Sequence, residues 1–201
     1  MDSIKQKNIQ IQGDERISIF FNCDLSSSSE GRLLAVNDKY MALAWKDKGT
    51  IKLVDSNQPK YVSQELLSFS CGKDNILDME FSPFDDNVLA LSDENGNVHL
   101  SRIQQKEEVI NLDHSLYKGH IQKVTYVNFN PVASNILCSS TSIGVVDVWD
   151  SEQFNTYTSI NLESPTALSW SPNGDLVGIS IKNNFLLLMI QEVILHHISY
   201  K

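Results

Sequence analysis

Cysteine is scarce in this 201-residue chain, which has three such residues, Cys23, Cys71 and Cys138. They are widely spaced and form no CxxC pair, so the sequence offers no disulfide framework and no cysteine-based metal set, and buried reduced thiols are expected. Long apolar runs are also absent. The longest, residues 185–190, is too short to span a bilayer, and no signal peptide precedes residue 20. These absences predict a soluble, cytosolic protein.

Positive charge is also in short supply. The chain has 16 Lys and Arg against 25 Asp and Glu, for a net charge of −9. This balance argues against non-specific binding to nucleic acid or to an anionic membrane. The imbalance is uneven, because residues 1–60 carry nine basic and eight acidic residues while residues 61–201 carry seven and seventeen. A contact with an acidic partner is therefore expected to involve the N-terminal part.

The motifs of phosphate binding and metal binding are missing as well. Gly72 and Lys73 have no glycine five residues upstream and no Ser or Thr after them, so they make no phosphate loop. His196 and His197 are adjacent, and on a strand they would point to opposite faces, so they cannot chelate one metal together. The sequence therefore predicts no enzyme, no cofactor and no metal.

The strongest pattern in the chain is residues 119–150, which reads GHIQKVTYVNFNPVASNILCSSTSIGVVDVWD. A Gly-His pair opens it, a Trp-Asp pair closes it, and two short apolar runs lie between. That order is typical of a WD-repeat β-propeller blade. His120 can reach toward the indole N–H of Trp149, and Ser139 can join them in a buried network whose members satisfy one another. This structural role for His120 is favoured over one as a general base.

Three further stretches repeat this order. Residues 33–55 contain expected strands at 40–45 and 50–54 around a Gly-bearing turn, residues 76–103 contain an Asn-Gly hairpin, and residues 165–190 contain a Ser-Pro-Asn-Gly turn. Prolines follow the first strands at Pro83, Pro131 and Pro172, spaced by 48 and 41 residues. This period is near the roughly 40–45 residues of WD repeats.

Aromatic residues at Phe81, Phe129 and Trp170 precede these prolines, and their matching positions place them in the core rather than on a nucleobase platform. The repeats are degenerate, because Val54, Ser101 and Met189 occupy the position of Trp149 in the other units. Ile143 stands where an Asp usually completes the network. Apolar packing is therefore expected to hold the other blades.

The expected architecture is an all-β WD-repeat propeller of about four blades with four antiparallel strands each. Residues 1–14 are expected to form a flexible arm, and residues 15–201 a partial β-propeller. The predicted blades are residues 33–62, 66–105, 115–162 and 163–199.

The N-terminal third indicates which family of WD-repeat proteins the chain resembles. The sequence ERISIFF, a serine-rich loop and LLAVNDKYMALAW resemble the entry into a coronin propeller, and the unit at 119–150 resembles coronins most closely. The resemblance covers about residues 14–190. It implies a seven-bladed propeller that binds filamentous actin. The four units found here would form an open part of that seven-bladed ring. The resemblance also implies that Arg16, after Asp14-Glu15, contributes to actin binding; the alternative is an ordinary edge-strand cation.

The predicted function is coronin-like binding to actin filaments in cytoskeleton organisation, at the actin cytoskeleton of the cytoplasm. The alternative is a generic WD-repeat scaffold that docks other proteins through propeller loops and has no actin role. Exposed blade edges are expected to favour self-association. The alternative to self-association is a closed four-bladed ring, in which residues 17–21 pair near residues 185–190.

Overall fold

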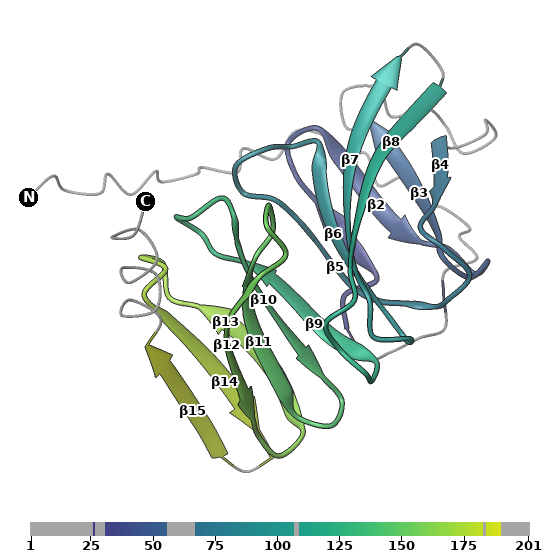
Figure 1. The fold of residues 1–201 in the computed structure, drawn as a ribbon. Helices are drawn as coiled ribbons and strands as arrows, with labels where there is room; N and C mark the ends of the chain where they lie inside the picture. Colours follow the sequence, from purple (N-terminus) through teal and green to yellow (C-terminus); the bar gives the residue numbers. More distant parts are fainter. Residues whose placement is uncertain (1–25, 27–30, 56–66, 107–108, 183, 190–201) are drawn as a thin grey trace, which may run out of the picture.

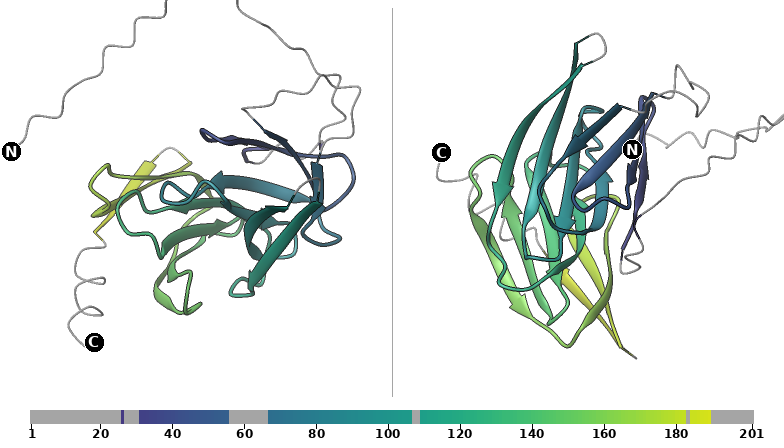
Figure 2. Two further views of the ribbon diagram at one scale, coloured as in Figure 1. Left: turned by 90° about the horizontal axis from the view of Figure 1, so that it is seen from above. Right: turned by 90° about the vertical axis from the view of Figure 1, so that its right-hand side faces the viewer.

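The computed structural model of the chain describes residues 26, 31–55, 67–106, 109–182 and 184–189. Within these residues the chain forms fifteen strands in four antiparallel sheets and contains no helix. The sheets follow one another along the chain, and each lies beside the next (Figures 1 and 2). The predicted all-β propeller architecture is confirmed.

Each sheet is a meander whose neighbouring strands are consecutive in the sequence. The first two sheets contain β1 (Leu34–Val36), β2 (Tyr40–Ala44), β3 (Thr50–Asp55) and β4 (Leu67–Ser70), then β5 (Ile76–Phe81), β6 (Val88–Asp93), β7 (Val98–Lys106) and β8 (Val109–Tyr117). The last two contain β9 (Val124–Phe129), β10 (Ile136–Thr141), β11 (Val145–Asp150) and β12 (Thr156–Asn161), then β13 (Pro165–Trp170), β14 (Leu176–Ile181) and β15 (Asn184–Met189). The fourth sheet thus has three described strands.

Glycines at two tight turns explain why the strands reverse where they do. Gly96, in the predicted Asn-Gly hairpin between β6 and β7, has φ 90°, and Gly144, between β10 and β11, has φ 104°. Both values lie in the left-handed region that L side chains rarely adopt. A Cβ atom at Gly144 would also collide with the carbonyl oxygen of Leu162. A short turn and close contact with the next loop therefore both require glycine there.

The core consists of three apolar clusters, each filling the space between two successive sheets. Ile51 and Leu91 belong to the cluster between the first and second sheets, and Trp149 belongs to the next. Val148 and Ile179 belong to the third. Because side chains alternate along a strand, each inner sheet supplies apolar residues to both of its neighbours. The sheets are therefore held together by burial on both faces, as in a solenoid or propeller.

The structure moves two of the predicted blade boundaries. β4 pairs with β3 through Phe69 and Ile51, so residues 67–70 belong to the first sheet and not to the second. β8 pairs with β7 along its whole length, so residues 109–117 belong to the second sheet, beyond the predicted limit of 105. The outermost strands carry the weakest apolar pattern, which is why the sequence misplaced them. Residues 56–62 of the predicted first blade lie outside the described residues.

β7 and β8 form a hairpin that is longer than the others. Their pairing continues to Lys106 and Val109, whereas β6 accompanies β7 only as far as Arg102. The end of this hairpin therefore extends beyond the second sheet, as Figure 1 shows. A two-stranded ribbon has little stability of its own in water, so the sheet at its base must support it.

The aromatic residues before the repeated prolines lie between the sheets. Phe81 and Phe129 are buried, and Trp170 is half-buried. The indole Nε1 of Trp170 donates to the carbonyl oxygen of Asn128, 3.4 Å away, and so links the fourth sheet to the third. Phe81 and Phe129 thus have the core position expected of them, and Trp170 lies at its edge.

Candidate functional site

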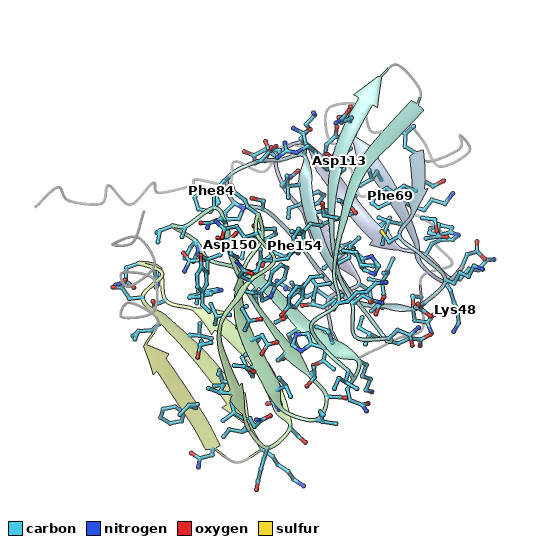
Figure 3. The ribbon with its side chains drawn as sticks, in the orientation of Figure 1. Lys48, Phe69, Phe84, Asp113, Asp150 and Phe154 are labelled. Carbon is cyan, nitrogen blue, oxygen red and sulfur yellow. The ribbon has the colours of Figure 1, made fainter. Side chains whose placement is uncertain are left out.

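Ser139 on β10 joins His120 and Trp149 in the third sheet. Its Oγ lies 2.7 Å from Nε2 of His120 and accepts a hydrogen bond of 3.2 Å from the indole Nε1 of Trp149. The indole is buried and stacks on Tyr117, with ring centroids 4.3 Å apart. Phe154, labelled in Figure 3, lies on it as well, at 6.2 Å. The structure thus brings together the three residues singled out in the sequence.

Asp147 is a member of this site that the sequence analysis missed. Its Oδ2 lies 3.5 Å from Nδ1 of His120. Asp147 stands two residues before Trp149 on β11, so both side chains point to the same face of the sheet. That period of two is the signal that could have identified it, in place of the turn position held by Ile143. The network therefore has a carboxylate, supplied by a strand.

This environment favours the neutral form of the His120 ring. Burial lowers the pKa of His120, and the Asp147 carboxylate opposes this only in part. A neutral ring with its proton on Nδ1 faces Asp147 and accepts the Ser139 hydroxyl at Nε2, which leaves the Ser139 oxygen free to accept the indole N–H. This arrangement fixes the loop before β9 against β10 and β11.

Asp150, the second residue of the Trp-Asp pair, fixes the turn between β11 and β12. Its Oδ1 accepts the backbone N–H groups of Glu152 and Gln153, at 2.7 and 2.9 Å. Its Oδ2 accepts from Asn135 and from the Tyr157 hydroxyl, both at 2.8 Å. Burial acts to raise the pKa of Asp150, but these hydrogen bonds outweigh it and hold the pKa below its usual value. All of its contacts are used in shaping the loop.

The second sheet has a buried polar pair of its own, which the sequence did not predict. Asp93 at the end of β6 lies 2.8 Å from Nε2 of His99 on β7 and accepts from Asn97. The registers of the two sheets show that His99 occupies the place that Asp147 has in the third sheet. Apolar residues of the second sheet pack in the core as expected, and the Asp93–His99 pair adds a polar link between β6 and β7.

A junction of charged residues connects three sheets where the strands β1, β5 and β9 meet. Arg32, just before β1, donates through Nε and Nη2 to the buried carboxylate of Asp78 on β5, both at 2.9 Å. The same Nη2 donates to the carbonyl oxygen of Val127 on β9, at 2.6 Å. Asp78 in turn accepts the backbone N–H of Val127, at 2.8 Å. One guanidinium therefore contacts both of the following sheets.

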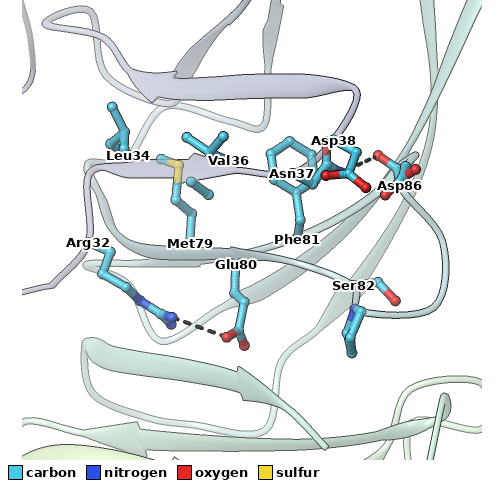
Figure 4. Close-up of a pocket in the computed structure, with 12 residues that line it drawn as sticks. Arg32, Leu34, Val36, Asn37, Asp38, Met79, Glu80, Phe81, Ser82 and Asp86 are labelled. Atoms are coloured by element: carbon cyan, nitrogen blue, oxygen red, sulfur yellow. Dashed lines mark hydrogen bonds and ion pairs between the residues drawn. The ribbon is translucent and has the colours of Figure 1, made fainter. Parts of the chain in front are cut away.

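Glu80, two residues further along β5, extends this junction. It accepts the backbone N–H of Phe129 at 2.7 Å and pairs with Nη1 of Arg32 at 3.2 Å (Figure 4). Burial raises the pKa of Glu80, although Arg32 and the Phe129 amide act in the opposite direction. The hollow beside it has a volume of about 460 Å³, and the exposed side chains of Leu34 and Val36 line it. This junction locks the register of adjacent inner strands.

Other predicted features are placed as follows. Arg16 and Cys23 lie outside the described residues. Cys71 and Cys138 are buried free thiols, and burial raises the pKa of Cys71 to about 12. In the described part of the chain, no group of three or more His, Cys, Asp and Glu side chains could hold a metal ion. No helix among the described residues has the length and apolar character needed to cross a bilayer.

Comparison with known proteins gives similarities of sequence and of fold. No family model matches the chain. It is 24% identical over 167 residues to the coronin-like protein crn1 of Schizosaccharomyces pombe, covering 79% of this chain and 28% of that protein. It is 28% identical over 112 residues to human coronin-7, covering 54% of this chain and 12% of that protein. The matched part thus spans little more than a quarter of the length of the first relative and about an eighth of the second.

The crystal structure of the WD40 domain of Toxoplasma gondii coronin superposes with a TM-score of 0.73 and 25% identity, covering 83% of this chain and 45% of that one. The β-propeller of Myceliophteria thermophila Cps50 (Swd1) gives a TM-score of 0.62 at 12% identity, covering 80% of this chain and 51% of that one, which shows the fold alone.

The four meandering sheets, the packing between them and the polar network of the third sheet define a β-propeller of the WD-repeat class. Within that class the chain is similar to coronins in both sequence and fold, and the resemblance predicted from its sequence is confirmed.

Proposed function

We propose that this chain is a coronin-like protein that binds actin filaments and acts in cytoskeleton organisation in the cytoplasm. The observation that carries the proposal is the similarity to coronins in sequence and in fold, with the Toxoplasma gondii coronin domain as the solved example. The polar groups described above support a binding module rather than an enzyme, because their contacts hold blades and turns in place. Loops at the rims of such modules are the usual docking surfaces.

Arg16 remains the proposed filament contact within the N-terminal part of the chain. It follows Asp14 and Glu15, in the position where the resemblance to coronins implies an actin-binding arginine. A guanidinium can make a charge-assisted bond to a carboxylate of an acidic filament. Nucleic acid and membranes are not proposed as partners, since the net charge of −9 opposes both.

Co-sedimentation with actin filaments tests the proposal. The folded chain is expected to pellet weakly with filaments at low ionic strength and to be released as salt rises from ~0.05 M to ~0.3 M, because the screening length shrinks over this range. A matched tube without filaments controls for aggregation of the chain itself. Pelleting no greater than in that control, at low salt and with a chain that melts cooperatively, would overturn the proposal.

A generic protein-docking scaffold is the second candidate. It is favoured by the likeness of the fold to propellers at 12% and 15% identity, one of them solved within the mitotic checkpoint complex. A scaffold of this kind would leave the co-sedimentation result at background while keeping the fold intact. The same assay therefore separates the two candidates.

A further inference from the structure

Among the described residues, the turns of the four sheets lie at two rims that differ in charge. One rim, here the lysine rim, consists of residues 45–49, 71–75, 94–97, 118–123, 142–144, 162–164 and 182. The other, here the aspartate rim, consists of residues 37–39, 82–87, 130–135, 151–155 and 171–175. In Figure 3, Lys48 of the first rim and Phe84 of the second lie at opposite ends of the sheets.

Contacts between sheets show that the turns of each rim are neighbours in space. On the lysine rim, Nζ of Lys48 lies 2.9 Å from Oε1 of Glu94. On the aspartate rim, the side-chain amide of Asn37 donates to the carbonyl oxygen of Asp86, and that of Asn130 to the carbonyl oxygen of Gly174, both at 2.9 Å. Each rim is therefore a continuous surface that runs across several sheets.

The charges on the two rims have opposite signs. The charged side chains of the lysine rim are Lys46, Lys48, Lys73, Lys118, Lys123 and Lys182 against Asp47, Asp74, Glu94 and Glu163. Those of the aspartate rim are Asp38, Asp85, Asp86, Glu152 and Asp175 against Lys39. A rim with an excess of lysine is unexpected in a chain whose net charge is −9. The field of the lysine rim favours an acidic partner, and that of the aspartate rim repels one.

Two large exposed apolar side chains, from neighbouring loops of the third sheet, lie on the lysine rim. Ile121 is 94% exposed and Ile143 is 60% exposed. The loops that carry them are neighbours, because the backbone N–H of Ser142 donates to the carbonyl oxygen of Lys123 at 3.1 Å. Apolar groups with charges around them have the composition of a docking surface, in which a desolvated centre contributes affinity and the surrounding charge orients the partner.

The buried network explains why this surface is ordered before any partner arrives. Ile121 directly follows His120, whose ring is fixed by Ser139 at 2.7 Å. Ile143 belongs to the β10–β11 turn, where the neighbouring Gly144 contacts the loop after β12. A side chain presented by a fixed backbone loses less freedom on binding than one in a mobile loop.

We infer that the lysine rim, with Ile121 and Ile143 exposed on it, is the surface through which this chain contacts an acidic face of the actin filament. This inference rests on the proposed function and adds to it the orientation of the propeller. The filament contact then includes residues of the second, third and fourth units, beyond the N-terminal part that the distribution of charge along the sequence favours. The aspartate rim faces away from the filament.

Co-sedimentation of a matched pair of variants tests the inference. Ile143→Glu and Val132→Glu change equally exposed apolar residues, 60% and 57%, on opposite rims and alter the net charge by the same amount. Ile143→Glu is expected to weaken pelleting about tenfold, while Val132→Glu stays within about twofold of the parent. Ile121→Glu, at the most exposed position, is expected to match Ile143→Glu. Thermal melting confirms that the variants remain folded.

Each result has a defined meaning. Loss of pelleting by the two lysine-rim variants, with Val132→Glu unaffected, supports the inference. Equal pelleting by all variants, or a larger loss for Val132→Glu, overturns it and leaves the proposed function intact. A parent chain that fails to pellet overturns the proposed function and this inference together. Should Ile143→Glu melt early, Ile121→Glu carries the test.

Discussion

The carboxylate of Asp147 lies 3.5 Å from Nδ1 of His120, on the side of the imidazole ring opposite Ser139. Nε2 of the ring is therefore held by the Ser139 hydroxyl, while Nδ1 faces the Asp147 carboxylate without a hydrogen bond of its own. Buried polar groups of this kind are costly when they lose a partner, because the group left behind cannot return to water. Stability, and with it the position of the lysine rim, is expected to depend on this pair.

Replacing the buried indole is expected to destabilise the third sheet. Trp149→Ala removes a fully buried ring together with the donor to Ser139, so the free energy of unfolding is expected to fall by about 3–5 kcal/mol. Denaturant unfolding followed by circular dichroism measures the change. Val132→Ala, at a side chain that is 57% exposed, is the control and is expected to change little. An unchanged midpoint for Trp149→Ala would contradict the blade assignment.

The lowered pKa of His120 predicts a dependence of stability on pH. The folded chain keeps the ring neutral, whereas the unfolded chain protonates it near its ordinary pKa of about 6.5. Because the unfolded state then binds more protons, this contribution is fully present above about pH 6.5 and is lost as the pH falls toward the folded pKa.

Unfolding free energies measured from about pH 8 to about pH 5.5 test this dependence. The parent chain is expected to lose stability over that interval, and His120→Gln is expected to show a shallower slope. The difference between the two slopes isolates His120 from the other titrating groups. Identical slopes would show that the ring protonates equally in both states.

Arg32 provides a further test, because its ion pair can be compared with an exposed one. Arg32→Met leaves the buried Asp78 carboxylate without its cation and is expected to cost about 2–3 kcal/mol, a value discounted because the guanidinium is 43% exposed. Arg102→Met is the control, since its partner Asp85 is partly exposed, and it is expected to cost under about 1 kcal/mol. Equal costs in denaturant unfolding would show that the junction does not lock the sheets.

Much of the fold could be predicted because its signals are local. The Asn95-Gly96 hairpin and the repeated prolines each mark a turn within a few residues. The Gly-His and Trp-Asp pairs around Trp149 likewise lie within a single unit. The Arg32–Asp78 contact joins residues 46 positions apart, and no periodicity connects them. The outermost strands depend on pairing rather than on their own pattern, so their limits were misplaced.

The opposite charges of the two rims could not be predicted either, because each rim joins turns that lie far apart in the sequence. Along the chain, positive charge is concentrated in residues 1–60, so the sequence favoured that part as the contact with an acidic partner. In space, turns from all four sheets meet, and Lys118, Lys123 and Lys182 come to share a rim with Lys48. Only the orientation of the strands decides which turns share an edge of the propeller.

The proposed contact at Arg16 predicts a selective loss of filament binding. Arg16→Asp reverses the charge, so it is expected to lower affinity at least tenfold in co-sedimentation. Lys7→Asp makes the same change in net charge elsewhere in the N-terminal part and is expected to have a smaller effect. If the two variants bind equally well, Arg16 is an ordinary surface cation. Matching melting curves for parent and variants exclude an effect of misfolding.

The outer face of the fourth sheet predicts how the isolated chain behaves in solution. A hollow of about 250 Å³ lies on this face, lined by Ala167, Leu168, Ser169, Gly178, Ile179, Ser180, Phe185 and Leu186. Leu168, Ile179 and Leu186 belong to the core cluster that packs against the third sheet, so the outer face itself presents Ala167, Gly178 and the 77% exposed Phe185. An exposed apolar surface of this kind favours association with another apolar surface. Light scattering after size exclusion is expected to show a mass that rises with concentration. Phe185→Ser is expected to shift the chain toward monomer, whereas Phe84→Ser, an exposed phenylalanine on the aspartate rim, leaves it unchanged. A chain that stays monomeric at all concentrations would contradict an open part of a seven-bladed ring. It would indicate instead that residues 17–21 pair near residues 185–190 and close a four-bladed ring.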